Sequence, residues 1–135
     1  MRKTSMVTIV AEGRDKGKTF HITEMSALQA ERWATRVLFA MAKGGAEIPE
    51  GIADAGMAGL IYIGLNACLK MNYEDAEPLL NEMLTCVKII PDPAKPLIMR
   101  SDIEGDIEEV ATLITLRSEI FYLHTGFSLP AILSK

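Results

Sequence analysis

The feature that most constrains this chain is the apolar segment Ile52–Met71, IADAGMAGLIYIGLNACLKM. Its only two charges, Asp54 and Lys70, lie near its ends, and on a helical wheel its large side chains point in every direction. A helix that is apolar on all sides is either buried in a protein core or placed in a membrane. The segment therefore predicts a buried central helix or a membrane contact.

The length of the segment favours the core. Its uncharged run, 55–69, would span roughly 22 Å as an α-helix, whereas the hydrocarbon layer of a bilayer is about 30 Å thick. Its glycines would cost a helix about 2–3 kcal/mol relative to alanine, which the close approach of neighbouring helices would offset. We therefore interpret 52–71 as a buried helix that the remaining helices cover.

Composition and charge narrow the class of protein. A chain of 135 residues is long enough to form one domain, 1–135, with a sizeable core. Its net charge of −4 argues against a protein that binds nucleic acid through bulk electrostatics. Hydrophobic residues make up 49% of the chain and include eight methionines. We expect part of this apolar load to face a partner protein.

The sequence offers no constellation that indicates an enzyme, a cofactor or a metal. It contains no nucleophile elbow, zinc-protease motif, phosphate-binding loop or dinucleotide fingerprint. Cys68 and Cys86 lack metal-site spacing and are predicted to be buried, reduced thiols. Since the first ten residues are too polar and too short for a signal peptide, we expect a cytoplasmic protein.

A β-hairpin is predicted over 6–22. Apolar side chains alternate on both sides of the turn GRDKG at 13–17. The cations Arg14, Lys16 and Lys18 suggest a phosphate-binding loop, but the loop lacks the required glycine and lysine pattern. We interpret it as a solvated hairpin tip.

The segment 26–43 has the signals of a helix with one buried face. Ser26 followed by Gln29 is a capping box, a pair of glycines after the segment is a typical stop, and apolar side chains recur at helical spacing. Phe39 falls on the opposite, cationic face, where a lone surface helix would not place it. It is either covered by a neighbouring segment or part of a contact surface.

Another helix is predicted over 73–87, with Asn72 as its N-cap and three carboxylates in its first turns. Pro78 lies early in this segment and predicts a kink or a looser first turn. The proline-rich stretch that follows predicts short extended pieces at 88–90 and 97–99, which we expect to pair with the hairpin.

The last helix, predicted over 103–125 from the capping box formed by Ser101 and Glu104, carries two apolar stripes. The first stripe is Ile107, Val110, Ile114 and Phe121, and the second is Leu113, Leu116, Ile120 and Leu123. The apolar arc covers about 200°, against roughly 100° for an ordinary surface helix. The first stripe can pack on 52–71. The second needs another cover, either Phe127 and Leu129 of the apolar tail 126–135 or another molecule.

Two polar side chains lie on the seam between these stripes. Arg117 is expected to pair with a carboxylate, which Glu109 or Asp106 could supply. His124, near the helix C-terminus, is interpreted as a capping or core histidine. Together the segments predict a mainly α fold of the α+β class, with about four helices around a central apolar helix and a small N-terminal hairpin.

Several runs of sequence carry a family likeness. The C-terminal part contains DIEEVAT at 106–112, followed by Leu116-Arg117, Glu119, Phe121, Leu123-His124 and Gly126-Phe127. Earlier in the chain stand EGRDKGKTFHITEM, QAERWATR, GMAGL and EDAEPLLNEM before CVKIIPDP. This combination resembles the tail assembly chaperones of long-tailed bacteriophages and prophages, and the likeness covers nearly the whole chain.

The resemblance implies a function that the residues alone do not specify. Chaperones of this family bind the tape-measure protein and the tail-tube subunit in the host cytoplasm, self-associate around the tape measure and are absent from the finished virion. Many are made in two lengths by a ribosomal frameshift, and this chain would be the short form. The family has no catalytic residues or cofactor, so the protein is expected not to be an enzyme.

The expected protein-binding residues are those of the second stripe and two phenylalanines: Leu113, Leu116, Ile120, Leu123, Phe39 and Phe127. The alternative is a DNA-binding regulator encoded on the same kind of mobile element, with Trp33, Arg32 and Arg36 on a recognition helix. The acidic balance opposes it, and a long glycine-containing linker replaces the tight turn of a helix-turn-helix. An enzyme of another type is the third possibility.

Overall fold

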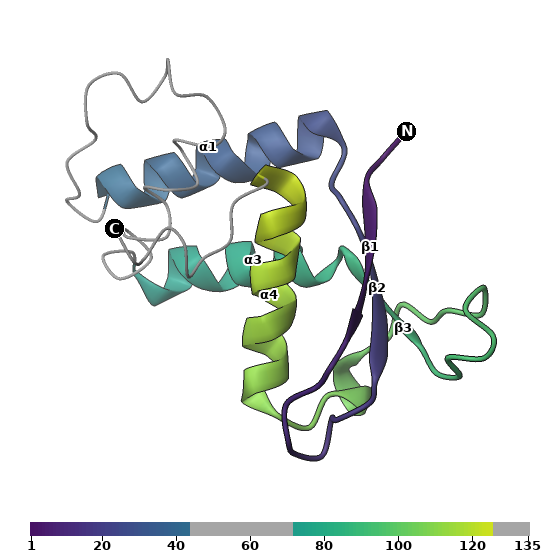
Figure 1. Ribbon diagram of the computed structural model, residues 1–135. Helices are drawn as coiled ribbons and strands as arrows, with labels where there is room; N and C mark the ends of the chain where they lie inside the picture. Colours follow the sequence, from purple (N-terminus) through teal and green to yellow (C-terminus); the bar gives the residue numbers. More distant parts are fainter. Residues whose placement is uncertain (44–71, 126–135) are drawn as a thin grey trace. The chain divides into compact units, whose positions relative to one another are not determined.

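The structure is a computed structural model that describes residues 1–43 and 72–125 of the chain (Figure 1). The predicted helix 52–71, the predicted tail 126–135, and with them Cys68 and Phe127, lie outside the described residues. The chain divides into two compact units, one formed by 1–24 with 83–135 and the other by 25–82. A single domain over 1–135 stays a prediction.

The described residues form a mixed α+β fold. They contain three α-helices, α1 (Ala27–Lys43), α3 (Tyr73–Leu84) and α4 (Val110–Thr125), and three strands, β1 (Thr4–Thr8), β2 (Thr19–Thr23) and β3 (Val87–Ile90). A short 3₁₀ turn, η1 (Glu104–Asp106), precedes α4. The predicted α+β class is therefore confirmed, whereas a fourth helix at the centre lies outside the described part of the chain.

The unit of 1–24 and 83–135 is built on an antiparallel sheet of order β1-β2-β3. Val7 pairs with Phe20, and Phe20 pairs with Ile89, so a continuous apolar row crosses one face of the sheet. Phe20 and Ile22 on this face are fully buried. The predicted hairpin and the pairing of 88–90 with it are both confirmed, since alternating apolar side chains in three short runs can share one buried face.

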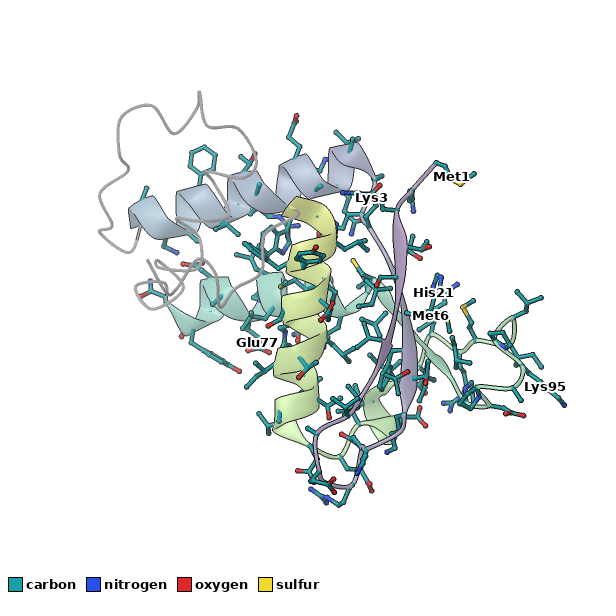
Figure 2. All side chains as sticks on the ribbon, in the orientation of Figure 1. Met1, Lys3, Met6, His21, Glu77 and Lys95 are labelled. Atoms are coloured by element: carbon teal, nitrogen blue, oxygen red, sulfur yellow. The ribbon has the colours of Figure 1, made fainter. Side chains whose placement is uncertain are left out.

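The opposite face of the sheet is largely open to solvent. Met6, His21 and Lys88 lie in one row across the three strands, with Met6 and Lys88 exposed and His21 half-buried. Figure 2 shows Met6 and His21 beside each other on the side of the sheet away from α4. The sheet therefore separates an apolar face from a polar one.

One predicted helix boundary and one predicted extended piece are wrong. The predicted helix 73–87 ends at Leu84, because Val87 belongs to β3 and pairs with Ile22. The extended piece expected at 97–99 is not a strand; instead Arg100 forms a single antiparallel bridge with Ile89.

The last helix begins at Val110 and not at 103. The capping box of Ser101 and Glu104 is followed only by η1, because Ile107 has extended backbone angles, φ −104° and ψ 118°, which interrupt a helix. The local cap signal at Ser101 therefore does not mark the start of α4. The actual start of α4 is fixed from elsewhere in the chain.

That start is capped by Asp15, at the tip of the β1–β2 hairpin. Its carboxylate Oδ2 accepts hydrogen bonds from the backbone N–H of Glu109 at 2.9 Å and from the Thr112 hydroxyl at 2.6 Å. The Glu108 N–H donates to both carboxylate oxygens at 3.1 Å, and Lys18 Nζ lies 2.9 Å from Oδ1. The N–H groups of the two residues that precede α4, and the Thr112 hydroxyl in its first turn, are thereby satisfied by a residue far away in sequence.

Asp15 is 1% exposed, so the hairpin tip is not simply solvated as predicted. Burial alone would raise the pKa of Asp15, but hydrogen bonds from Thr112, Lys18 and the backbone of Glu108 and Glu109 outweigh it and hold the pKa well below its usual value. The carboxylate is therefore charged at neutral pH, which strengthens each of these hydrogen bonds.

The unit of 25–82 contains α1 and nearly all of α3. Ser26 Oγ accepts the N–H of Gln29 at 3.2 Å, which confirms the predicted cap of α1. The Trp33 indole N–H donates to the Leu79 carbonyl at 2.9 Å, and Arg36 forms an ion pair with Glu82. α1 and α3 are thus joined by polar contacts as well as by packing around Ala34, Val37 and Leu79, which are buried.

We predict that Asp15→Ala lowers the free energy of unfolding by about 2–4 kcal/mol, because it leaves buried N–H donors and Lys18 without their acceptor. Urea denaturation followed by circular dichroism measures the change. Lys16→Ala in the same loop is the control: the exposed Lys16 pairs with the exposed Glu12, and its loss is expected to change the free energy of unfolding by less than about 0.5 kcal/mol. Equal stability of the two variants would contradict the capping role of Asp15.

Candidate protein-binding surface

α4 is apolar on nearly its whole circumference, and the structure distinguishes its two sides. Leu116 and Ile120 are 0% and 1% exposed, and Leu113 and Leu123 are half-buried. α4 contacts β1, so this stripe faces the interior of the unit. The prediction that Leu116 and Ile120 contact a partner is therefore corrected: they are core residues, because the apolar face of the sheet requires a cover that the hairpin alone did not reveal.

The opposite side of α4 is exposed. Val110, Ile114 and Tyr122 have exposed fractions of 72%, 60% and 51%. With the exposed Ala111 and Thr115, they form an uncharged surface that we call the outer face of α4. Val110 and Ile114 belong to the stripe that was expected to pack on 52–71, whereas Phe121 of the same stripe is buried. The predicted packing of the first stripe on 52–71 lies outside the described residues and stays a prediction.

The polar residues of α4 have defined surroundings. The carboxylates expected beside Arg117 are engaged elsewhere: Glu109 pairs with Arg14 at 2.8 Å, and Asp106 with Arg100 at 2.8 Å. Burial lowers the pKa of Arg117. His124 Nδ1 lies 2.7 Å from the Ile120 carbonyl, which fits the predicted role of a histidine at a helix C-terminus.

A second apolar surface lies in the other unit, in a groove of about 330 Å³ between α1 and α3. The groove is lined by Arg36, Phe39, Ala40, Lys43, Glu74, Asp75, Pro78 and Leu79. Phe39 is 69% exposed, so no neighbouring segment among the described residues covers it, and its role in a contact surface stays a prediction. Lys43 Nζ lies 3.4 Å from Asp75 Oδ2, an ion pair without hydrogen-bond geometry.

The described residues contain neither a candidate metal site nor a candidate membrane-spanning helix. Across 1–43 and 72–125, no group of three or more histidine, cysteine or acidic side chains could hold a metal ion. None of the helices seen there is long and apolar enough to cross a membrane. Cys86 is a buried free thiol, as predicted.

Comparisons with protein-family models, with curated proteins and with solved structures found no match to this chain.

We predict that Leu116→Asp and Ile114→Asp have opposite consequences for folding. Leu116→Asp buries an unpaired charge and is expected to cost about 3–5 kcal/mol, whereas Ile114→Asp on the outer face is expected to change the free energy of unfolding by less than about 1 kcal/mol. Thermal denaturation of both variants, monitored by circular dichroism, gives the comparison. A folded, stable Leu116→Asp variant would contradict the assignment of the buried stripe.

Proposed function

We propose that this protein is a non-catalytic tail assembly chaperone of a long-tailed bacteriophage or prophage. It binds the tape-measure protein, the tail-tube subunit or both in the host cytoplasm while the tail is assembled. The proposal originates in the sequence resemblance. The structural observation that supports it best is the outer face of α4, because an uncharged helix face with large exposed apolar side chains is typical of a protein-binding surface.

The outer face lies within the part of the chain that carries the resemblance most densely. Val110 belongs to the run DIEEVAT. Ile114 lies between this run and Leu116, and Tyr122 lies between Phe121 and Leu123. Burial of a large apolar side chain contributes about 1.5–3 kcal/mol to association before the entropic cost is subtracted. Three such side chains, Val110, Ile114 and Tyr122, can therefore contribute to a specific contact, together with the surface around them.

The proposal includes a fourth, buried helix over 52–71 at the centre of the fold. Its support is the composition of that segment and the position of the groove between α1 and α3. α1 ends at Lys43 and α3 begins at Tyr73, and residues from these two ends, among them Lys43 and Glu74, line the groove. The chain between them thus leaves and returns close to an apolar surface that includes Phe39.

The DNA-binding alternative has less support. A recognition helix needs side chains that are free to contact bases. On α1 the Trp33 indole donates to the Leu79 carbonyl and Arg36 pairs with Glu82, so a regulator that used both side chains for DNA would lose two contacts between α1 and α3.

The test is co-purification of the tagged protein with the tape-measure protein encoded in the same genome. Wild-type protein is expected to retain the tape-measure protein, and the double variant Ile114→Asp with Tyr122→Asp is expected to lose at least 90% of it. Leu97→Asp is the matched control, because Leu97 is an exposed apolar residue in the loop after β3 and not on α4.

Circular dichroism of each variant is the control for folding. No retention by the wild-type protein of either the tape-measure or the tail-tube protein would contradict the proposed function. Equal retention by the wild type and the double variant would place the binding surface elsewhere than on the outer face of α4.

A further inference from the structure

The two edges of the sheet differ in the described structure. At the β3 edge, Ile89 and Arg100 exchange two backbone hydrogen bonds, each of 2.9 Å. The chain after β3 therefore returns and closes this edge at its centre. No such segment from the described residues pairs with the free side of β1, since β1 pairs only with β2. The sheet has one closed edge and one open edge.

The hydrogen-bond pattern identifies which groups of β1 face outward. The Ile9 N–H donates to the Lys18 carbonyl, and the Glu24 N–H donates to the Lys3 carbonyl. Because antiparallel pairing alternates along a strand, the odd-numbered residues of this strand direct their backbone groups to β2. Thr4, Met6 and Thr8 direct theirs away from the sheet, and within the described part of the chain these groups have no hydrogen-bond partner.

The β1 edge lacks the features that usually prevent strands from pairing between molecules. Natural edge strands are protected by charged side chains, proline, bulges or a covering segment. The strand TSMVT contains no charged residue and no proline, and it pairs with β2 without a bulge. Met6 at its centre is 56% exposed. A row of regularly spaced donors and acceptors is therefore available for another strand.

We propose that β1 pairs with β1 of a second copy of this chain, antiparallel and about a two-fold axis at Met6. In this register Met6 faces Met6 of the second copy, and Thr4 faces its Thr8. Every outward donor then meets an acceptor, and the two three-stranded sheets continue as one. The strand TSMVT carries no charged side chain on either face, so the register brings no like charges opposite each other within it.

The charges beside the strand favour this antiparallel arrangement over a parallel one. Arg2 and Lys3 precede β1, and Glu12 follows it. A parallel pair would place the cations of both copies side by side. The antiparallel pair instead places the cations of the two copies at opposite ends of the joint. Such an isologous pair closes on itself, and it does not depend on the phage proteins proposed above as partners.

The association is measured by sedimentation velocity over a range of protein concentrations. Wild-type protein is expected to form a dimer. Met6→Pro removes the outward N–H without removing a hydrogen bond to β2, and it is expected to weaken dimerisation at least tenfold. Met6→Val keeps the N–H and the strand preference, so its dimerisation is expected to stay within about threefold of wild type.

Cysteine substitutions locate the joint independently of the proline variant. Opposed residues of a hydrogen-bonded antiparallel pair have Cα atoms about 5.5 Å apart, which a disulfide can bridge. Met6→Cys is therefore expected to form a covalent dimer under mild oxidation, with the bond between the introduced cysteines identified by mass spectrometry. Lys88→Cys is the matched control, since Lys88 is exposed in the same row but on β3.

Three results would overturn the inference: a monomer at all concentrations, a dimer unaffected by Met6→Pro, or equal crosslinking of the Met6→Cys and Lys88→Cys variants. If circular dichroism shows that Met6→Pro does not fold, the comparison of the two cysteine variants decides. Covalent dimer from Met6→Cys alone then supports the strand pairing.

Discussion

The buried carboxylate of Asp15 is the interaction on which the unit of 1–24 and 83–135 depends. It joins the tip of the β1–β2 hairpin to the start of α4, through the N–H groups of Glu108 and Glu109 just before the helix and the hydroxyl of Thr112 in its first turn. Arg14 reinforces the joint through Glu109. Because a buried charge without partners is costly, Asp15 remains inside only when the hairpin and the helix start are both in place.

This joint determines how α4 meets the sheet. Once its first turn is held at the hairpin tip, the helix lies along β1 and its stripe of Leu116 and Ile120 becomes interior. This placement of α4 also determines which surfaces of the unit stay exposed. The outer face of α4 is left exposed, and the edge of β1 is left unpaired by any described segment. The two surfaces proposed for association therefore have the same structural origin.

The parts predicted correctly from sequence are those that local signals determine. The hairpin, the cap of α1 at Ser26 and the strand at 88–90 each follow from alternation or from residues within one turn. The start of α4 could not be predicted this way, because its capping residue lies some 90 positions earlier and a local capping box at Ser101 points to a different start.

The orientation of α4 shows a second limit of prediction from sequence. Both stripes are apolar, so periodicity identifies two faces without showing which one is buried. The answer depends on which side the sheet occupies, and a hairpin predicted from its own alternation does not show which helix face covers it. Leu116 and Ile120, which were predicted to contact a partner, are consequently buried.

Amide hydrogen exchange of Glu108 and Glu109, measured by NMR, reports whether the hairpin tip holds the start of α4. These two residues precede the helix, where amides otherwise exchange freely with water. Because Asp15 accepts both N–H groups, they are expected to exchange as slowly as the Phe20 and Ile22 amides of β2, since all four would open only when the unit unfolds. Exchange at the rate of an unstructured peptide would contradict this role of Asp15.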